Sequence, residues 1–170
     1  MSPTGSKGIL NRQAPLLVVC LALVVCLGAL RNGFTFDDLY IVKGNPLVTG
    51  DGGLRPIFAS HYWAAEDPHG DLYRPLTVAS YWLNYRISGV TTFAYHLTNL
   101  LLHGIVTFLV YLVFTRLAAS LPGGDTRASP EVVALAGASF FAVHPVHVEA
   151  VVSVVGRAEL LAAFFVLLAW

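Results

Sequence analysis

Four apolar stretches divide the chain, and polar segments rich in glycine and proline separate them. Residues 15–30 carry no charged side chain and lie near the lower limit of about 17 residues for a membrane span, whereas 95–117 is long enough to cross with tilt. Residues 131–143 are short for a bilayer at about 1.5 Å per helical residue, so they either borrow flanking residues or pack among other helices. A fourth stretch, 160–170, stops after about three helical turns, as in a truncated span. The pattern predicts an all-α membrane protein with about four transmembrane helices.

Basic residues predict how these spans are oriented. Lys7 and Arg12 precede the first span, and Arg116 and Arg127 flank the connection between the second and third, so both places are expected to be cytoplasmic. A signal peptide with Lys7 and Arg12 in its basic region is an alternative for the first thirty residues, and it leaves the following loop on the same far side. The predicted order is a cytoplasmic tail (1–14), a first span (15–30), an outer or lumenal loop (31–94), a second span (95–117), a cytoplasmic loop (118–130), a third span (131–143), a lumenal or re-entrant polar segment (144–159) and a truncated fourth span (160–170).

Within the outer loop, residues 76–87 repeat apolar and aromatic side chains at helical spacing, with polar side chains between them. We expect an amphipathic helix lying along the membrane interface, with Trp63 and Trp82 at the level of the lipid headgroups.

Composition supports a membrane protein and excludes some partners. Of the residues 56% are hydrophobic and 12% charged, and the mean hydropathy is +0.68. The net charge is zero and no run of Lys or Arg occurs, so nucleic acid is not an expected partner. Cys20 and Cys26 lie six positions apart in one span, too far apart to be bridged, and are expected to be packing residues.

The first candidate chemistry is an acidic pair, Asp37-Asp38, just behind the first span. Adjacent carboxylates in an extended segment point in different directions, so one could face a substrate while the other orients it. On residue types alone, capping a short helix that begins at Leu39 explains Asp38 equally well, but the position of the pair shortly beyond a membrane exit shifts the balance toward a site. Farther on, Arg74 precedes a helix start at Pro75 and could bind a phosphate, although an ion pair with a loop acid such as Asp71 is the commoner outcome.

A second polar cluster of uncertain role follows the third span and contains His144, His147, Glu149 and Glu159, with Arg157 beside it. If 147–157 is one helix, Glu149, Ser153 and Arg157 share a face.

Histidine and glutamate are zinc ligands, but H-x-x-H-x-E lacks the H-E-x-x-H spacing of helical zinc sites. A divalent metal is therefore conceivable but not indicated, and no cofactor is expected with certainty. His96 and His103 in the second span are expected to be hydrogen-bonded packing residues.

Several of these segments together resemble the transmembrane and tetratricopeptide repeat-containing (TMTC) proteins. They are FDD (36–38), NPL (45–47), LYRPLT (72–77), YHLTNLLLH (95–103) and FAVHPVHVEAVVSVVGRAELL (141–161). The resemblance is specific in combination and covers nearly the whole chain from about Phe34. It implies the first part of a polytopic glycosyltransferase of the GT-C type, without the tetratricopeptide repeats and later helices.

The resemblance further implies transfer of mannose from dolichyl-phosphate-mannose to Ser or Thr hydroxyls of lumenal proteins, such as cadherins. Asp37 or Asp38 would act as general base, and Arg74 and Arg157 would bind the donor phosphate. The chain would be a multi-pass protein of the endoplasmic reticulum membrane in a eukaryote, or of the inner membrane in a bacterium.

Gly70-Asp71-Leu72 replaces a longer insertion of the animal members, so the substrate pocket could differ and a bacterial undecaprenyl-type donor is conceivable. As a fragment the chain could be inactive alone. The rival hypothesis is a non-catalytic membrane module whose polar cluster packs against a partner helix.

Overall fold

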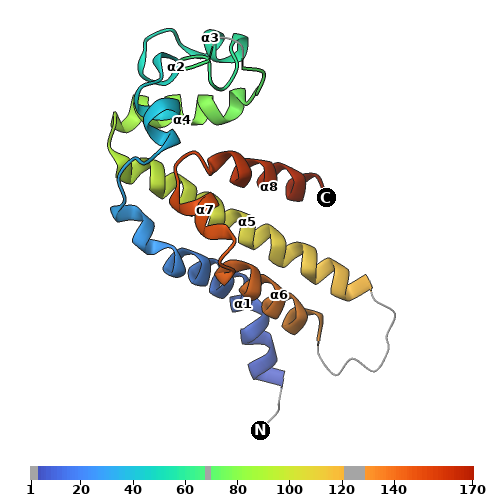
Figure 1. The fold of residues 1–170 in the computed structure, drawn as a ribbon. Helices are drawn as coiled ribbons and strands as arrows, with labels where there is room; N and C mark the ends of the chain where they lie inside the picture. Colours follow the sequence, from blue (N-terminus) through green and yellow to red (C-terminus); the bar gives the residue numbers. More distant parts are fainter. Residues whose placement is uncertain (1–3, 68–69, 121–128) are drawn as a thin grey trace.

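A computed structural model describes residues 4–67, 70–120 and 129–170, and every regular element in these ranges is helical (Figure 1). The expected all-α class is confirmed for this part of the chain. Arg127 and most of the loop expected at 118–130 lie outside the described residues.

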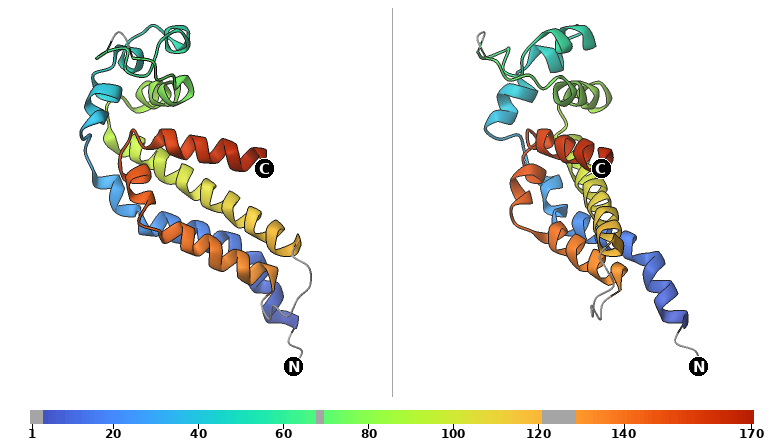
Figure 2. Two further views of the ribbon diagram at one scale, coloured as in Figure 1. Left: turned by 45° about the vertical axis from the view of Figure 1, so that its right-hand side comes forward. Right: turned by 90° about the vertical axis from the view of Figure 1, so that its right-hand side faces the viewer.

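Four helices run in alternating directions along one another (Figures 1 and 2). They are α1 (Thr4–Val25), α5 (Thr92–Ser120), α6 (Pro130–Val143) and α8 (Arg157–Ala169). α5 packs against the other three, and α1 also packs against α6. Because the directions alternate, the C-terminal ends of α1 and α6 and the N-terminal ends of α5 and α8 lie toward the same end of the molecule. The two polar segments of the sequence meet at that end.

Among the described residues, α5 is the one helix both long and apolar enough to cross a membrane. The apolar part of α1, Gln13–Val25, and α6 are shorter. α1 ends at Val25, and a 3₁₀ helix, η1 (Leu27–Arg31), replaces the last turn of the expected span at 15–30. The number of four membrane-crossing helices therefore stays a prediction.

Short helices form a cap over this end of the bundle (Figure 1). They are the π-helix η2 (Leu39–Lys43), α2 (Pro46–Thr49), α3 (Leu54–Ala59) and α4 (Pro75–Ser88). α2 begins where the Asn45 side chain accepts the Leu47 N–H at 2.9 Å, and α4 ends at Gly89, whose φ of 61° suits glycine.

α4 occupies the stretch in which sequence spacing predicted a helix at 76–87. It buries Val78 and Tyr81 in a core with Ile41, Ile57 and Tyr95. One side of α4 is therefore covered by protein, whereas Leu76, Leu83 and Ile87 are exposed. The expected location of α4 at the membrane interface stays a prediction.

Residues 147–157 do not form one helix, so the condition for a shared polar face is not met. α7 (His147–Val152) ends at Ser153, whose backbone is extended, and α8 starts separately at Arg157. The turn folds back so tightly that a Cβ on Gly156 would lie 2.5 Å from the Ala150 carbonyl oxygen. Glu149, Ser153 and Arg157 therefore do not share a helix face.

Candidate functional site

A pocket of about 380 Å³ lies between the cap and the segment that joins α6 to α8. The cap contributes Asp37 and Arg74 to its wall, and the later segment contributes Glu149, Ser153 and Glu159. Residues 31–94 and 144–159, which are separated by the longest helix, thus meet at one site. Three carboxylates around one guanidinium give the wall an acidic character.

The two adjacent aspartates occupy different environments. Asp37 is exposed and lines the pocket, whereas Asp38 has no exposed surface. Asp38 Oδ1 accepts the Val155 N–H at 2.9 Å and lies 3.4 Å from Ser153 Oγ, and its Oδ2 accepts the Thr35 N–H at 3.1 Å. Asp38 therefore ties the turn before η2 to the turn before α8.

The helix-cap interpretation of Asp38 fails, because its side chain makes no capping hydrogen bond to η2. The residue before the pair is also unusual, since Phe36 has a φ of 45° and is 87% exposed. Left-handed backbone is uncommon for a bulky L-residue. This conformation is part of the tight turn in which the Asp38 N–H donates to the Thr35 carbonyl at 2.9 Å.

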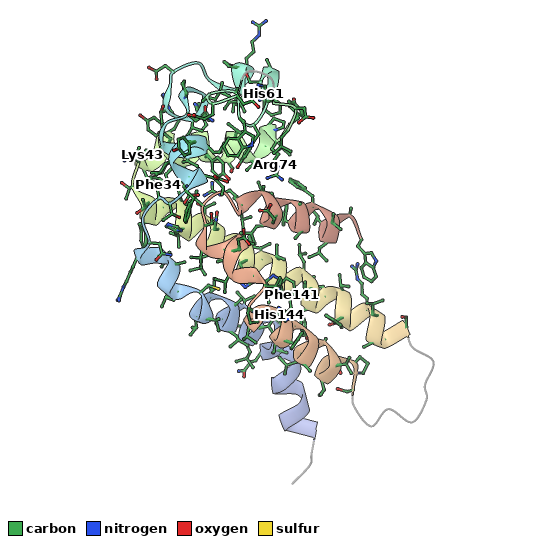
Figure 3. All side chains as sticks on the ribbon, in the orientation of Figure 1. Phe34, Lys43, His61, Arg74, Phe141 and His144 are labelled. Carbon is green, nitrogen blue, oxygen red and sulfur yellow. The ribbon has the colours of Figure 1, made fainter. Side chains whose placement is uncertain are left out.

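Arg74 stands at the N-terminal end of α4, on the side of the cap that faces α8 (Figure 3). Its guanidinium lies 3.9 Å from a Glu159 carboxylate oxygen and 5.3 Å from the centre of the Tyr62 ring. The ion pair thus forms with Glu159 and not with the expected loop acid Asp71. Burial raises the pKa of Tyr62, so its phenol stays neutral beside this guanidinium.

Arg157 lies deeper than Arg74 and has no exposed surface. Its Nε donates to Asn99 Oδ1 at 2.8 Å, one terminal nitrogen to Asn84 Oδ1 at 2.6 Å and to Ser80 Oγ at 3.2 Å, and the other to the Tyr95 carbonyl at 2.9 Å. The guanidinium is thus held by α4 and α5.

Two further side chains hold the turn before α8, and sequence reasoning did not select either of them. Asn99 donates to the carbonyl oxygens of Ser153 and Val154 at 2.8 and 3.3 Å, and the Tyr81 hydroxyl lies 3.3 Å from the Val154 carbonyl. The sequence contained a signal for Asn99, because an asparagine within an apolar span requires hydrogen-bond partners.

The polar cluster expected at 144–159 divides into two parts. Glu149 and Glu159 line the pocket, whereas His144 lies at the junction of α6 and α7 with Phe141 (Figure 3). His147 packs 4.1 Å from the Phe141 ring centre.

In α5, His103 Nε2 lies 3.4 Å from the Ala142 carbonyl, in agreement with a hydrogen-bonded packing role. His96 is also fully buried, but neither of its ring nitrogens makes a hydrogen bond to a described residue, so the expected hydrogen bonding is not seen there. Among the described residues, no three His, Cys, Asp or Glu side chains converge to hold a metal ion.

Comparison with known proteins identifies relatives along nearly the whole chain. It is 36% identical over 168 residues to a protein O-mannosyl-transferase of Caenorhabditis elegans and 39% identical over 174 residues to protein O-mannosyl-transferase Tmtc1 of Drosophila melanogaster, with 96% and 99% of the chain covered. Human protein O-mannosyl-transferase TMTC3 is 34% identical over 164 residues, covering 95% of the chain. The chain belongs to the TMTC family.

The chain spans less than a quarter of the length of these relatives, with 23%, 19% and 17% of the worm, fly and human proteins covered. No protein-family model and no solved structure matches it. In these relatives, the segment that matches the chain is one part of a longer protein.

Proposed function

We propose that the chain contributes the acceptor-activating site of a membrane protein O-mannosyltransferase. In this proposal mannose passes from dolichyl-phosphate-mannose, or a related polyprenyl-phosphate donor, to Ser or Thr hydroxyls of lumenal proteins such as cadherins, at the endoplasmic reticulum membrane. The names of the TMTC relatives support the reaction class. The observation that carries the proposal is the pocket in which an exposed carboxylate, Asp37, and a guanidinium, Arg74, line the same wall.

Asp37 is the proposed general base. A Ser or Thr hydroxyl is a weak nucleophile unless a nearby group accepts its proton while the new C–O bond forms. Asp37 opens to the pocket, whereas both oxygens of Asp38 already accept hydrogen bonds from the protein. We therefore assign the base to Asp37 and a positioning role to Asp38.

Arg74 is the proposed partner of the donor phosphate. Cleavage of the sugar–phosphate bond leaves negative charge on the departing lipid phosphate, which a planar guanidinium can stabilise through two parallel hydrogen bonds. Arg157 was expected to share this task. However, a phosphate could reach Arg157 only by displacing the buried partners that already surround its guanidinium. We therefore assign the donor phosphate to Arg74 alone.

The test measures transfer of radiolabelled mannose from dolichyl-phosphate-mannose to a Ser-containing peptide in membranes that contain the protein. We expect Asp37→Asn to abolish transfer while leaving donor binding within about threefold, and Arg74→Ala to weaken donor binding at least tenfold. Arg55→Ala, at an exposed arginine elsewhere in the cap, is the matched control. Full transfer by Asp37→Asn would refute the assignment of the base. Absence of both transfer and donor binding in the unaltered protein would instead favour a non-catalytic membrane module.

A further inference from the structure

We infer that Arg157 is a positioning residue whose buried guanidinium fixes the cap helix α4, and with it Arg74, relative to the turn before α8, which also holds Asp38, the neighbour of Asp37. The inference rests on the proposed function above for its catalytic meaning. Its geometric content is independent of that function. Three observations support it. They are the set of acceptors around the guanidinium, the hydrogen bonds that hold the turn before α8, and the positions of the two proposed reacting groups, Arg74 next to α4 and Asp37 next to Asp38.

The acceptors around Arg157 are neutral and come from two different helices. Ser80 and Asn84 lie on α4, and Asn99 and the Tyr95 carbonyl lie on α5. The guanidinium also lies 4.8 Å from the centre of the Tyr81 ring. None of the ion pairs between described residues includes Arg157.

Hydrogen bonds fix the orientation of two of these acceptors, the side-chain amides of Asn84 and Asn99. The amide nitrogen of Asn84 donates to Thr98 Oγ1 at 3.1 Å, and that of Asn99 donates to the Ser153 carbonyl at 2.8 Å. Each amide therefore presents its oxygen to Arg157, and the planar guanidinium matches a fixed set of oxygen atoms. A lysine, with a single ammonium on a flexible stem, cannot reproduce this fork.

A contribution to folding stability does not by itself explain why an arginine is buried at this position. Burying an arginine costs free energy, and well-packed apolar side chains of similar volume often serve folding as well or better. A buried charge with several directional partners instead favours one particular arrangement of the elements that supply those partners.

The elements that Arg157 joins are those of the proposed reaction. Arg157 begins α8 directly after the turn whose Val155 N–H is bonded to Asp38, the neighbour of Asp37. It also clamps α4, whose N-terminal end carries Arg74. The turn thus connects the proposed base on one side with the proposed phosphate partner on the other, and Arg157 fixes their separation.

The geometric test compares Arg157→Lys with Arg86→Lys, a control at an exposed arginine of α4. Spin labels are placed at Ile87 on α4 and Val148 on α7, both exposed, after replacement of the two native cysteines by serine. Pulsed electron paramagnetic resonance measures the distance between the two labels. It should give one narrow distance distribution for the unaltered protein and for Arg86→Lys, and one about twice as broad for Arg157→Lys. Adding Asn84→Asp should restore the narrow distribution, because a carboxylate gives the lysine a charged acceptor.

The kinetic test separates positioning from phosphate binding. In the transfer assay we expect Arg157→Lys to lower kcat by about 10- to 100-fold, as expected for a small misplacement of reacting groups, while the KM for the donor changes less than threefold. Asn84→Asp in combination should recover most of kcat.

An unbroadened distance distribution in Arg157→Lys would overturn the inference. So would a donor KM raised as much as by Arg74→Ala, because Arg157 would then bind the phosphate itself. Absence of transfer by the unaltered protein would refute the proposed function instead, and the distance measurement would still decide the inference about Arg157.

Discussion

Asp38→Asn is the substitution that most directly tests how the pocket wall is held. The native carboxylate accepts backbone N–H groups of Thr35 and Val155 with its two oxygens and has no exposed surface. An asparagine offers one oxygen acceptor, so its NH₂ group must face one of these two donors. One buried N–H group then loses its partner, and the other hydrogen bond loses the charge of its acceptor.

The magnitude follows from these two losses. A buried polar group left without a partner costs about 1 to 3 kcal/mol, and hydrogen bonds to charged groups are worth about 1 kcal/mol more than neutral ones. We expect Asp38→Asn to lower the free energy of unfolding by about 2 to 4 kcal/mol. For a chain of this size each kcal/mol shifts Tm by about 2 to 4 °C, so the expected decrease in Tm is about 4 to 16 °C.

The assay is thermal unfolding of the purified protein in detergent, followed by circular dichroism. Asp37→Asn is the matched control, because Asp37 is exposed and surface substitutions usually change stability by less than about 0.5 kcal/mol. The two variants should separate stability from activity, with Asp37→Asn folded but inactive. Equal Tm values for Asp38→Asn and the unaltered protein would show that Asp38 does not hold the turn before α8.

Three further predictions use the same measurement of Tm. Gly156→Ala should destabilise the protein by about 2 to 3 kcal/mol, because its Cβ would overlap the backbone of α7, whereas Gly28→Ala meets nothing within 4 Å and should be neutral. Phe36→Gly should raise Tm by about 2 to 4 °C by relieving left-handed backbone, and Phe36→Leu should not. Burial and the neighbouring His144 lower the pKa of His147 from 6.5. Its contribution to stability is therefore complete above about pH 6.5 and is lost as the pH falls toward the folded pKa, so acidification from pH 7.5 should lower Tm less in His147→Gln.

Helices with strong local signals were predictable from the sequence. Proline at the first turn and glycine after the last mark both ends of α4, and the predicted 76–87 differs from Pro75–Ser88 by one residue at each end. Similarly, the apolar stretch at 131–143 lies within α6, which starts at Pro130. In both helices the signals that determine the ends lie within a few residues of them.

The site itself depends on contacts that local patterns do not encode. Asp38 and Val155 are 117 positions apart, and nothing near either residue shows that the carboxylate of Asp38, rather than that of Asp37, is buried. The break between α7 and α8 could not be predicted for the same reason, because the residues from 147 to 157 are compatible with a helix. The extended turn is held by long-range hydrogen bonds, one that Asp38 accepts from Val155 and one that Asn99 donates to Ser153. By contrast, the spacing of Ser80 and Asn84 by four residues on a predicted helix does indicate that both could contact one polar partner.

The ion pair between Arg74 and Glu159 bears on whether a phosphate could enter this acidic pocket. The two side chains are 36% and 58% exposed and their nearest charged atoms are 3.9 Å apart, which is a long and solvated contact. Such pairs contribute at most about 1 kcal/mol, whereas a phosphate can bind a guanidinium through two short charge-assisted hydrogen bonds. Glu159 therefore holds Arg74 in the pocket without blocking it. A donor that displaces Glu159 leaves that carboxylate in water, and Asp37 remains the carboxylate facing the acceptor hydroxyl.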